Sequence, residues 1–313
     1  MRFGLGKLLA QINNFFLDLG EIHDTQNGFK FFTNKTAKEL FRNLEISRWL
    51  FDIEIIKKAK VTGLKIVRLP VVWEDVAESK VGLGKDFLSV AGELMVIYLN
   101  FFSFKMFLVL FLFCLTVVLA PFVVRPDWLV LRNGDFSDLI WPDYYFVKDS
   151  IVNLHQIPFW NPTLFSGIPE INPQSMLLYP PNWISFLLPL NFSLVFLIFL
   201  HVLIAGILMY LFSNKILKLP PLASTVMVFI FCFSPFLWGK FAVGHLILGF
   251  SLLLISGVLF FGGVFYKKPD FKSFLFTAIF FSLIYLNHPG IWYYAVLFSM
   301  AALVVLWFKE GSG

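Results

Sequence analysis

Long apolar runs fill the chain from Met106 onward, whereas its first third alternates short apolar stretches with charged ones. A helix needs roughly 20 apolar residues to cross the hydrocarbon core of a bilayer. Six runs approach this length, and we expect each of them to form a membrane-spanning helix. The runs are Met106–Val124, Phe192–Phe212, Leu222–Trp238, Ala242–Tyr266, Ser273–Asn287 and Ile291–Phe308.

Lysine is unevenly distributed over the loops between these runs. The loops after the second and fourth runs hold Lys215, Lys218, Lys267, Lys268 and Lys272. The short turns on the opposite side hold Lys240 alone. Because cytoplasmic loops are enriched in Lys and Arg, the pattern predicts a multi-pass protein of the cell membrane. Its N-terminus is expected in the cytoplasm and its residues 125–191 outside.

The first third has shorter apolar stretches and predicts a separate domain. The elements expected there are helices at 37–46 and 52–60, a strand at Ile66–Val72 and an amphipathic helix at Phe87–Phe104. The amphipathic segment leads into the first span and is expected to lie along the membrane surface. The sequence therefore predicts a mixed fold: a partial α/β cytoplasmic segment over 1–104 and a helical membrane domain over 105–313.

Composition supports this division. The 313 residues are 58% hydrophobic and 14% charged, with a mean hydropathy of +0.78, which excludes a soluble globular protein and a disordered chain. Of the 25 Lys/Arg and 20 Asp/Glu, 15 and 12 lie in residues 1–105. The net charge of +5 is too small for a nucleic-acid-binding protein. Cys114 and Cys232 lie within apolar runs and are expected to be small buried side chains.

Residues 125–191 combine carboxylates, amides and aromatic side chains at a density suited to carbohydrate. Aromatic faces stack on sugar rings, amides bind hydroxyl groups, and an Asp can act as a general base. The candidate binding residues are Trp160, Asn161, Asn172 and Gln174. A solvated loop held by prolines is the alternative. The end of the segment, Tyr179–Leu190, predicts a short re-entrant or interfacial helix anchored by Trp183.

Three histidines, His201, His245 and His288, lie within or at the ends of the predicted spans, without the spacing of a zinc site. His201 is expected to be a hydrogen-bonded core residue. His245 and His288 lie at the outer ends of their spans, beside the expected sugar site, and are candidates for substrate binding. No span has a charged residue at its centre, which argues against an ion pump or transporter.

Four segments of the first third follow one another in a specific order: Asp24–Phe32, Arg48–Glu54, Leu69–Trp73 and Ser79-Lys80. Together they resemble the C-terminal half of family-2 glycosyltransferases of the dolichyl- or polyprenyl-phosphate sugar synthase type. Within that type the likeness is to dolichyl-phosphate β-glucosyltransferases. The resemblance implies a GT-A-like segment that transfers a sugar from a nucleotide donor to a lipid phosphate at the cytoplasmic face.

The same resemblance assigns site residues. Those it places in the site are Asp24, Gln26, Lys30 and Lys80. It implies that Asp24 deprotonates the acceptor and that Lys80 contacts the lipid phosphate. Asp52 and Glu54 are either active-site carboxylates or helix residues with a structural role.

Enzymes of this type hold a divalent cation, Mg²⁺ or Mn²⁺, on an Asp-x-Asp motif of a nucleotide-binding half. No Asp-x-Asp precedes Asp24, so the ligands of the cation are not all present. We expect Met1 to fall inside a larger domain, or a partner chain to supply the nucleotide-binding half. The chain alone is then unable to turn over a nucleotide sugar.

A second series of segments lies in the membrane part: Gly134–Tyr144, Ile157–Pro162, Asn172–Ser175, Leu178–Asn182, Gly244-His245 and Asn287–Gly290. This series resembles GT-C-type membrane proteins, in particular the YfhO-like group. The resemblance implies a lipid-phosphate sugar as donor and an Asp of the first external loop as the base that deprotonates the acceptor. Asp135 is the first candidate for this role and Asp138 the second.

The sequence thus predicts a membrane glycosyltransferase-related protein whose partners are the lipid bilayer and a polyprenyl- or dolichyl-phosphate sugar, with no nucleic acid. The expected product is a cell-surface glycan or glycolipid. A non-catalytic membrane anchor that recruits a partner is the alternative. A lipid or sugar transporter is a third interpretation, against which the uncharged spans argue.

Overall fold

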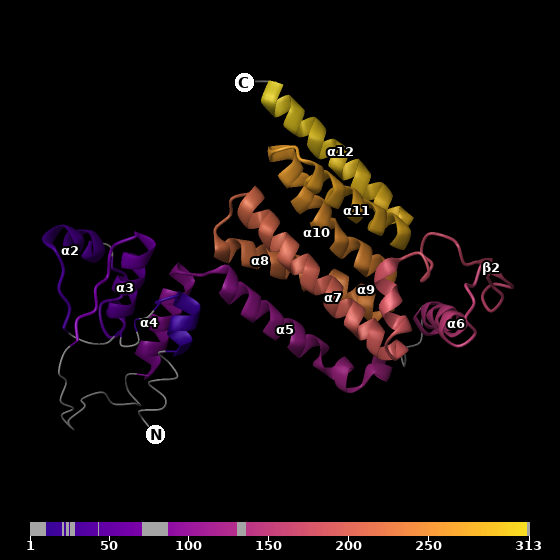
Figure 1. Cartoon of the computed structure of the whole chain (residues 1–313), viewed down its shortest axis with the longest axis horizontal. Helices are drawn as coiled ribbons and strands as arrows, with labels where there is room; N and C mark the ends of the chain where they lie inside the picture. The colour runs from indigo at the N-terminus through magenta and orange to yellow at the C-terminus, as the bar shows by residue number, and fades with distance from the viewer. Residues whose placement is uncertain are drawn as a thin grey trace. The chain divides into compact units, whose positions relative to one another are not determined.

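The computed structural model describes residues 11–20, 22, 25, 29–42, 44–70, 87–129 and 136–311. The chain divides into two compact units, Met1–Met106 (unit 1) and Phe107–Gly313 (unit 2). Most of the described residues are helical, and Figure 1 labels helices α2 to α12 and strand β2.

The described part of unit 1 contains α2 (Asn34–Phe41), α3 (Phe51–Val61) and α4 (Phe87–Asn100), together with a helical stretch at 11–17. Apolar side chains from these helices and their connections meet in a core of Leu17, Leu19, Ile46, Ile53, Ile56, Ile97 and Met106. A smaller cluster of Leu40, Ile55 and Ala59 joins α2 to α3. Since α3 contributes to both clusters, it organises the packing of this unit.

α2 ends earlier than the predicted helix at 37–46. The backbone that follows it is bonded elsewhere, because the N–H groups of Glu45 and Ile46 donate to the carboxylate of Glu54 at 3.0 and 2.8 Å. These two groups are therefore not available to a helical ladder. α3 covers the second predicted helix, 52–60.

The strand expected at Ile66–Val72 is not formed over 66–70, and the rest of it lies outside the described residues. Its apolar side chains Ile66, Val67 and Leu69 are exposed. A strand needs a neighbour that satisfies its backbone groups, and no described segment of unit 1 pairs with it. An α/β, GT-A-like character is therefore not evident in this unit.

The amphipathic segment and the first span are separate helices rather than one continuous run. α4 ends at Asn100, and α5 (Phe104–Val124) begins after residues 101–103. Ser103 caps the start of α5, because its Oγ accepts a hydrogen bond from the N–H of Met106 at 3.4 Å.

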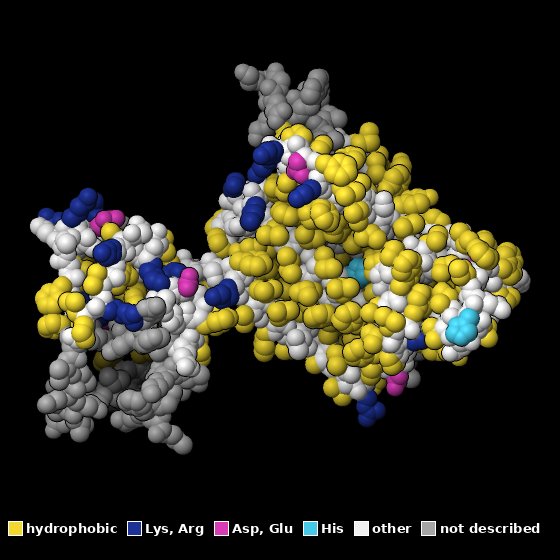
Figure 2. All heavy atoms as spheres, in the orientation of Figure 1, with side chains coloured by type: hydrophobic (Ala, Val, Ile, Leu, Met, Phe, Trp, Pro, Cys, Tyr) yellow, Lys and Arg dark blue, Asp and Glu magenta, His cyan; other side chains and the backbone are white. Residues whose placement is uncertain are grey.

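Four helical segments in the described part of the chain are long and apolar enough to cross a membrane. They are α5, α7 (Leu190–Leu211) with the π-helical turn η4 (Phe212–Ile216), α8 (Pro221–Cys232) with α9 (Pro235–Ala242), and α10 (Leu246–Lys267). α11 (Phe271–Asn287) is apolar but has only 17 residues, and α12 (Pro289–Gly311) covers the sixth predicted run. The count of six spans stays a prediction. Apolar side chains cover most of the visible face of unit 2 (Figure 2), as expected for a membrane protein.

The third predicted span is two helices rather than one. α8 ends at Cys232 and α9 begins at Pro235, a residue that cannot continue a helical hydrogen-bond ladder. Ser234 caps α9 by accepting from the N–H of Leu237 at 3.3 Å. The Trp238 indole donates to the carbonyl of Cys232 at 3.0 Å, so the break leaves this carbonyl satisfied.

Small residues let the helices of unit 2 approach closely. α10 packs against both α7 and α11. A side chain at Gly206 would meet the ring of Phe111, and one at Gly257 would meet the ring of Phe280. Glycine at such positions is typical of helix packing in membranes, where association depends on close van der Waals contact.

The two lysine-rich loops of unit 2 lie together. The Lys267 ammonium group donates to the carbonyls of Lys215 and Ile216 at 3.1 and 2.8 Å. The loops after α7 and α10 are thus on the same side of the helices, as the lysine pattern requires. Which side of the membrane they occupy stays a prediction.

Residues 125–189 connect α5 to α7, and we call them the long connection. Its elements are η1 (Pro126–Leu129), η2 (Phe136–Ile140), α6 (Trp141–Val152), strands β1 (Trp160–Asn161) and β2 (Ile168–Pro169), and η3 (Pro180–Phe186). The strands are antiparallel, with Trp160 opposite Pro169. A short helix does form in the predicted segment Tyr179–Leu190: η3 begins at its prolines, and the Trp183 indole donates to the carbonyl of Leu177 at 2.8 Å.

Candidate functional site

Two residues assigned to the glycosyltransferase site, Lys30 and Asp52, form an ion pair in unit 1. The Lys30 ammonium group lies 2.8 Å from the Asp52 carboxylate and donates to the carbonyl of Thr25 at 3.1 Å. Asp52 is buried in the first turn of α3, where the helix dipole favours a negative charge. The fold thus fixes the Lys30 ammonium group between one carboxylate and one backbone carbonyl.

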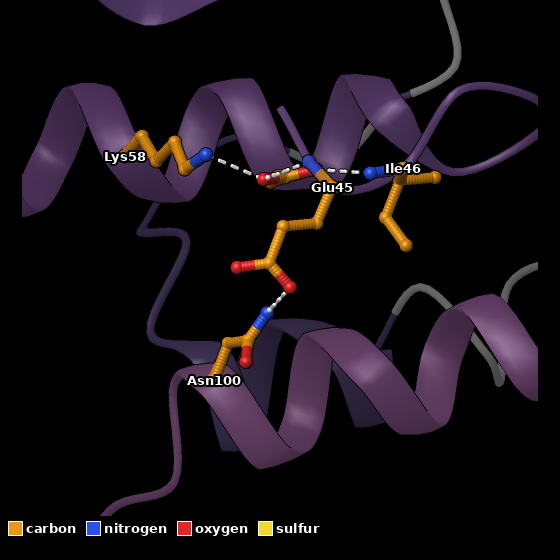
Figure 3. Close-up of polar contacts among 5 residues, drawn as sticks. Glu45, Ile46, Lys58 and Asn100 are labelled. Atoms are coloured by element: carbon orange, nitrogen blue, oxygen red, sulfur yellow. Dashed lines mark hydrogen bonds and ion pairs between the residues drawn. The ribbon is translucent and has the colours of Figure 1, made fainter. Parts of the chain in front are cut away.

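Glu54 has a structural role in this fold. Its carboxylate is 2% exposed, accepts the N–H groups of Glu45 and Ile46, and lies 2.5 Å from the Lys58 ammonium group (Figure 3). Asn100 of α4 in turn donates to the side chain of Glu45 at 2.8 Å. Because these contacts occupy its oxygens, Glu54 holds the turn before α3 in place. This supports a structural role for Glu54 over a role as an active-site carboxylate.

The sequence did not single out Glu93, which has a similar role. It lies on α4 and accepts the N–H groups of Trp49 and Leu50 at 3.0 and 2.9 Å. These donors precede α3, so Glu93 satisfies N–H groups at the helix start that have no partner in the helix itself. A lone Glu in an apolar helix carries no local signal of this contact.

Four of the assigned residues cannot be placed: Asp24, Gln26, Lys80 and Asp135 lie outside the described residues. Of the two Asp candidates in the long connection, Asp138 is described. It is exposed and accepts a hydrogen bond from the Ser137 hydroxyl at 2.8 Å.

The candidate binding residues of the long connection do not form one group. Trp160 is exposed and packs over Gly167, which has a φ of +113°. Asn172 donates to the carbonyl of Pro169 at 2.5 Å, and Gln174 is exposed. Asn161 alone is fully buried, inside a polar cluster.

This cluster, the Asp143 cluster, consists of Asp143, Asn161, Glu170 and Ser175. The Asn161 amide donates to Asp143 Oδ1 at 3.0 Å, and the Ser175 hydroxyl donates to Glu170 Oε1 at 2.8 Å. Glu170 is 1% exposed, and no described residue donates to its Oε2. The cluster ties α6 to the strand pair and to the segment that follows it.

The Asp143 carboxyl group favours its protonated form. Burial raises its pKa to about 7, and the neighbouring carboxylate of Glu170 adds to the shift. Two carboxylates in a desolvated site repel each other, so a proton between them is favoured. The sequence pattern did not single out Asp143 or Glu170 as site residues. Their burial follows from packing between segments 27 residues apart, which no local pattern reports.

The histidines occupy three different positions. Nε2 of His201 lies 2.6 Å from the Tyr179 hydroxyl, and its ring stacks on Phe250 at 4.0 Å, as expected for a hydrogen-bonded core residue. His245 precedes α10. His288 ends α11, and its Nδ1 accepts from the N–H of Ile291 at 3.3 Å. The structure does not gather these rings into one site.

No group of three His, Cys, Asp or Glu side chains that could hold a metal ion occurs in the described part of the chain. The residues present there do not by themselves fit a Mg²⁺ or Mn²⁺ site. The expectation of a cation whose ligands are only partly in this chain stays a prediction.

Comparison with known proteins links part of the chain to one type of enzyme. It is 46% identical over 59 residues to "Dolichyl-phosphate beta-glucosyltransferase ALG5A" of Trichomonas vaginalis, covering 19% of this chain and 18% of that protein. Dolichyl-phosphate beta-glucosyltransferases of Drosophila melanogaster and Saccharomyces cerevisiae are 35% identical over 80 residues and 34% over 83. Each match covers 26% of this chain, and 24% and 25% of those proteins.

The chain therefore spans about a fifth to a quarter of the length of these curated relatives. Within that part it is homologous to dolichyl-phosphate β-glucosyltransferases, as the first resemblance predicted. No family model and no solved structure matches the chain. The likeness of the membrane part to GT-C-type proteins stays a prediction.

Proposed function

We propose that this chain is part of a membrane glycosyltransferase system that acts on polyprenyl- or dolichyl-phosphate sugars. The observation that carries the proposal is the 33–46% identity to dolichyl-phosphate β-glucosyltransferases over 59–88 residues. The four candidate spans support it, because a lipid-phosphate substrate stays in the bilayer.

In unit 1 the proposed role of Lys30 is to hold positive charge near the acceptor phosphate. Asp52 and the Thr25 carbonyl fix the position of its ammonium group. Asp24 is the proposed base, and Lys80 the proposed second phosphate contact. The nucleotide-binding half, with its divalent cation, is supplied by sequence beyond this chain or by a partner chain.

In unit 2 the proposed role is to use the lipid-linked sugar on the other side of the membrane, with Asp135 as the first candidate for the base and Asp138 as the second. The long connection supports this role, because a segment of this length between two spans is typical of a functional loop. The N-terminus and both lysine-rich loops are then cytoplasmic.

The first test combines this chain with the part of a relative that the chain does not match. Membranes are prepared from cells that express the full chain, the part of the Saccharomyces cerevisiae relative that this chain does not match, or both. Transfer of labelled glucose from its nucleotide to dolichyl phosphate is measured in the lipid extract. We expect label only when both are present, and at least tenfold less with Lys30→Met.

Lys35→Met on the exposed surface of α2 is the matched control and should transfer normally. Label without the relative's part would refute the need for a nucleotide-binding half. No label with both parts would contradict the proposal for unit 1. For unit 2, Asp135→Asn should abolish glycan transfer at the cell surface, and Asp149→Asn in the same connection should not. Equal transfer by both variants would refute the role of Asp135.

A further inference from the structure

A cavity of about 590 Å³ lies where the long connection meets the start of α7, and its lining includes residues 126 and 127, which follow α5. Its walls include Asp127 of η1, Trp141, Tyr145 and Lys148 of α6, and Leu190 and Asn191 at the start of α7. We call it the Trp141 pocket. Because α5 ends at Val124 and α7 begins at Leu190, the pocket lies at the level where these two helices end, the level at which a span meets the membrane surface.

One face of α6 supplies an aromatic platform and a cation. Trp141, Tyr145 and Lys148 follow each other at positions i, i+4 and i+7, so they share a face of the helix. The rings of Trp141 and Tyr145 stack with centroids 5.3 Å apart and an angle of 16° between their planes. Tyr145 is 52% exposed, so its ring is accessible from the pocket.

The platform is held in a fixed relation to a carboxylate. The Trp141 indole donates to Oδ1 of Asn191 at 2.8 Å, and Nδ2 of Asn191 donates to Oδ1 of Asp127 at 2.7 Å. Both ends of the Asn191 amide are thus engaged, which fixes its orientation. The Asp127 carboxylate and the aromatic pair therefore form one rigid wall.

The cation is also held in place. The Lys148 ammonium group donates to the carbonyl of Leu188, just before α7. An ammonium group has three N–H donors, so this contact positions the charge without using all of them. The pocket thus offers a flat apolar surface, a hydrogen-bond acceptor and a positive charge, all at the end of two candidate spans.

We infer that the Trp141 pocket binds the headgroup of a membrane-embedded lipid phosphate that carries a sugar. The sugar ring would stack on the exposed ring of Tyr145, its hydroxyl groups would donate to Asp127, and the phosphate would face Lys148. The ligand class rests on the proposed function, whereas the position of the site comes from the pocket. Asp138 does not line the pocket, and the inference deepens the proposal by naming where the lipid-linked sugar is held.

The test measures binding to the full chain in phosphatidylcholine nanodiscs, purified without glycoside detergents, which would compete for such a pocket. Three probes share one lipid tail: farnesyl phosphate, farnesyl β-glucoside and farnesyl-phosphoryl-glucose. Affinity is measured by isothermal titration for the unchanged chain and for Tyr145→Ala, Tyr145→Phe, Lys148→Gln and Phe159→Ala. Phe159 is an exposed aromatic residue of the same connection that does not line the pocket, so it is the matched control.

We expect Tyr145→Ala to weaken binding of the two glucose-bearing probes about tenfold, because it removes the stacking ring. Farnesyl phosphate should be affected less than twofold, and Tyr145→Phe should bind like the unchanged chain. Lys148→Gln should weaken the two phosphate-bearing probes about tenfold and leave farnesyl glucoside unchanged. Phe159→Ala should change none of them.

Unchanged binding in Tyr145→Ala would overturn the inference. In Tyr145→Ala, equal losses for farnesyl phosphate and farnesyl-phosphoryl-glucose would also overturn it, because the pocket would then recognise a lipid phosphate and no sugar. The two proposals fail separately. Binding as described without label in the transfer assay contradicts only the proposed function of unit 1, and label in that assay with binding indifferent to Tyr145 contradicts only the inference.

Discussion

Carboxylates inside the two units are held in opposite ways. In unit 1, Glu54 accepts two backbone N–H groups and faces Lys58, and Glu93 accepts two backbone N–H groups. In unit 2, Asp143 lies beside Glu170, and the described side chains that donate to the two are a neutral amide and a neutral hydroxyl. Both arrangements connect segments distant in sequence, but only the first pairs its carboxylates with backbone N–H groups and, at Glu54, an ammonium group.

The difference teaches how each unit is stabilised. A carboxylate that accepts backbone N–H groups replaces the hydrogen bonds that a turn or a helix start lacks. A buried carboxyl pair without a cation is stable only when a proton is shared. Unit 1 is therefore expected to depend on the hydrogen bonds that its carboxylates accept, and the long connection of unit 2 on the protonation of its carboxyl pair.

The largest expected effect comes from Glu54→Ala. It leaves Lys58 and the N–H groups of Glu45 and Ile46 without their acceptor, which should destabilise unit 1 by about 3 to 5 kcal/mol. Hydrogen exchange of the 44–61 peptides, measured by mass spectrometry on the full chain, reports this loss. Glu39→Ala on the exposed surface of α2 is the control and should exchange as the unchanged chain does. Protection of 44–61 that survives Glu54→Ala would show that the turn does not depend on this carboxylate.

The second effect is a pH dependence confined to the long connection. The pKa of Asp143 is raised to about 7, from an ordinary value near 4 in the unfolded chain. Between these values the folded state binds more protons than the unfolded state, so stability falls as the pH rises. The contribution is fully present below pH 4 and lost above about 7, and its size is about 4 kcal/mol.

Hydrogen exchange of the 157–176 peptides at pH 5 and pH 8, corrected for the intrinsic exchange rate, measures this change. Asn resembles a protonated Asp, so Asp143→Asn should keep the connection protected at both pH values. Asp149→Asn is the control, because Asp149 lies on the same helix outside the cluster, and it should retain the pH dependence. A pH dependence that persists in Asp143→Asn would place the titrating group elsewhere.

The sequence can predict a feature that depends on one segment alone. It cannot predict a feature that depends on contacts between distant segments. The long apolar runs predicted α5, α7 and α10 because the length needed to cross a bilayer is a property of one segment. The break after Cys232 does have a local signal, Ser234-Pro235, but the continuous apolar run concealed it. The strand expected at Ile66–Val72 depends on a partner segment, which no local pattern supplies.

The candidate sites follow the same rule. The resemblance named Lys30 and Asp52 separately, and the structure shows that they form a pair. Asn161 was predicted as a sugar-binding residue, yet its amide is used inside the Asp143 cluster. The Trp141 pocket joins residues 127, 141 and 191, so its existence depends on the packing of the long connection against α7. The sequence predicted which residue types a site contains, but it did not predict which residues each of these side chains contacts.

The smallest expected effect concerns the Lys30–Asp52 pair. Its side chains are 20% and 11% exposed, so solvent screens the pair only in part. A double-mutant cycle of Lys30→Met and Asp52→Asn should give a coupling of about 1 kcal/mol, measured by hydrogen exchange of α3. A cycle on Lys35 and Glu39, one turn apart on the exposed surface of α2, is the control, with an expected coupling below about 0.5 kcal/mol. Equal couplings in the two cycles would mean that the Lys30–Asp52 pair stabilises the fold no more than an exposed surface pair does. A larger coupling for the Lys30–Asp52 pair would show that the pair stabilises the fold around α3. Loss of transfer in Lys30→Met would show in addition that the charge of Lys30 takes part in binding.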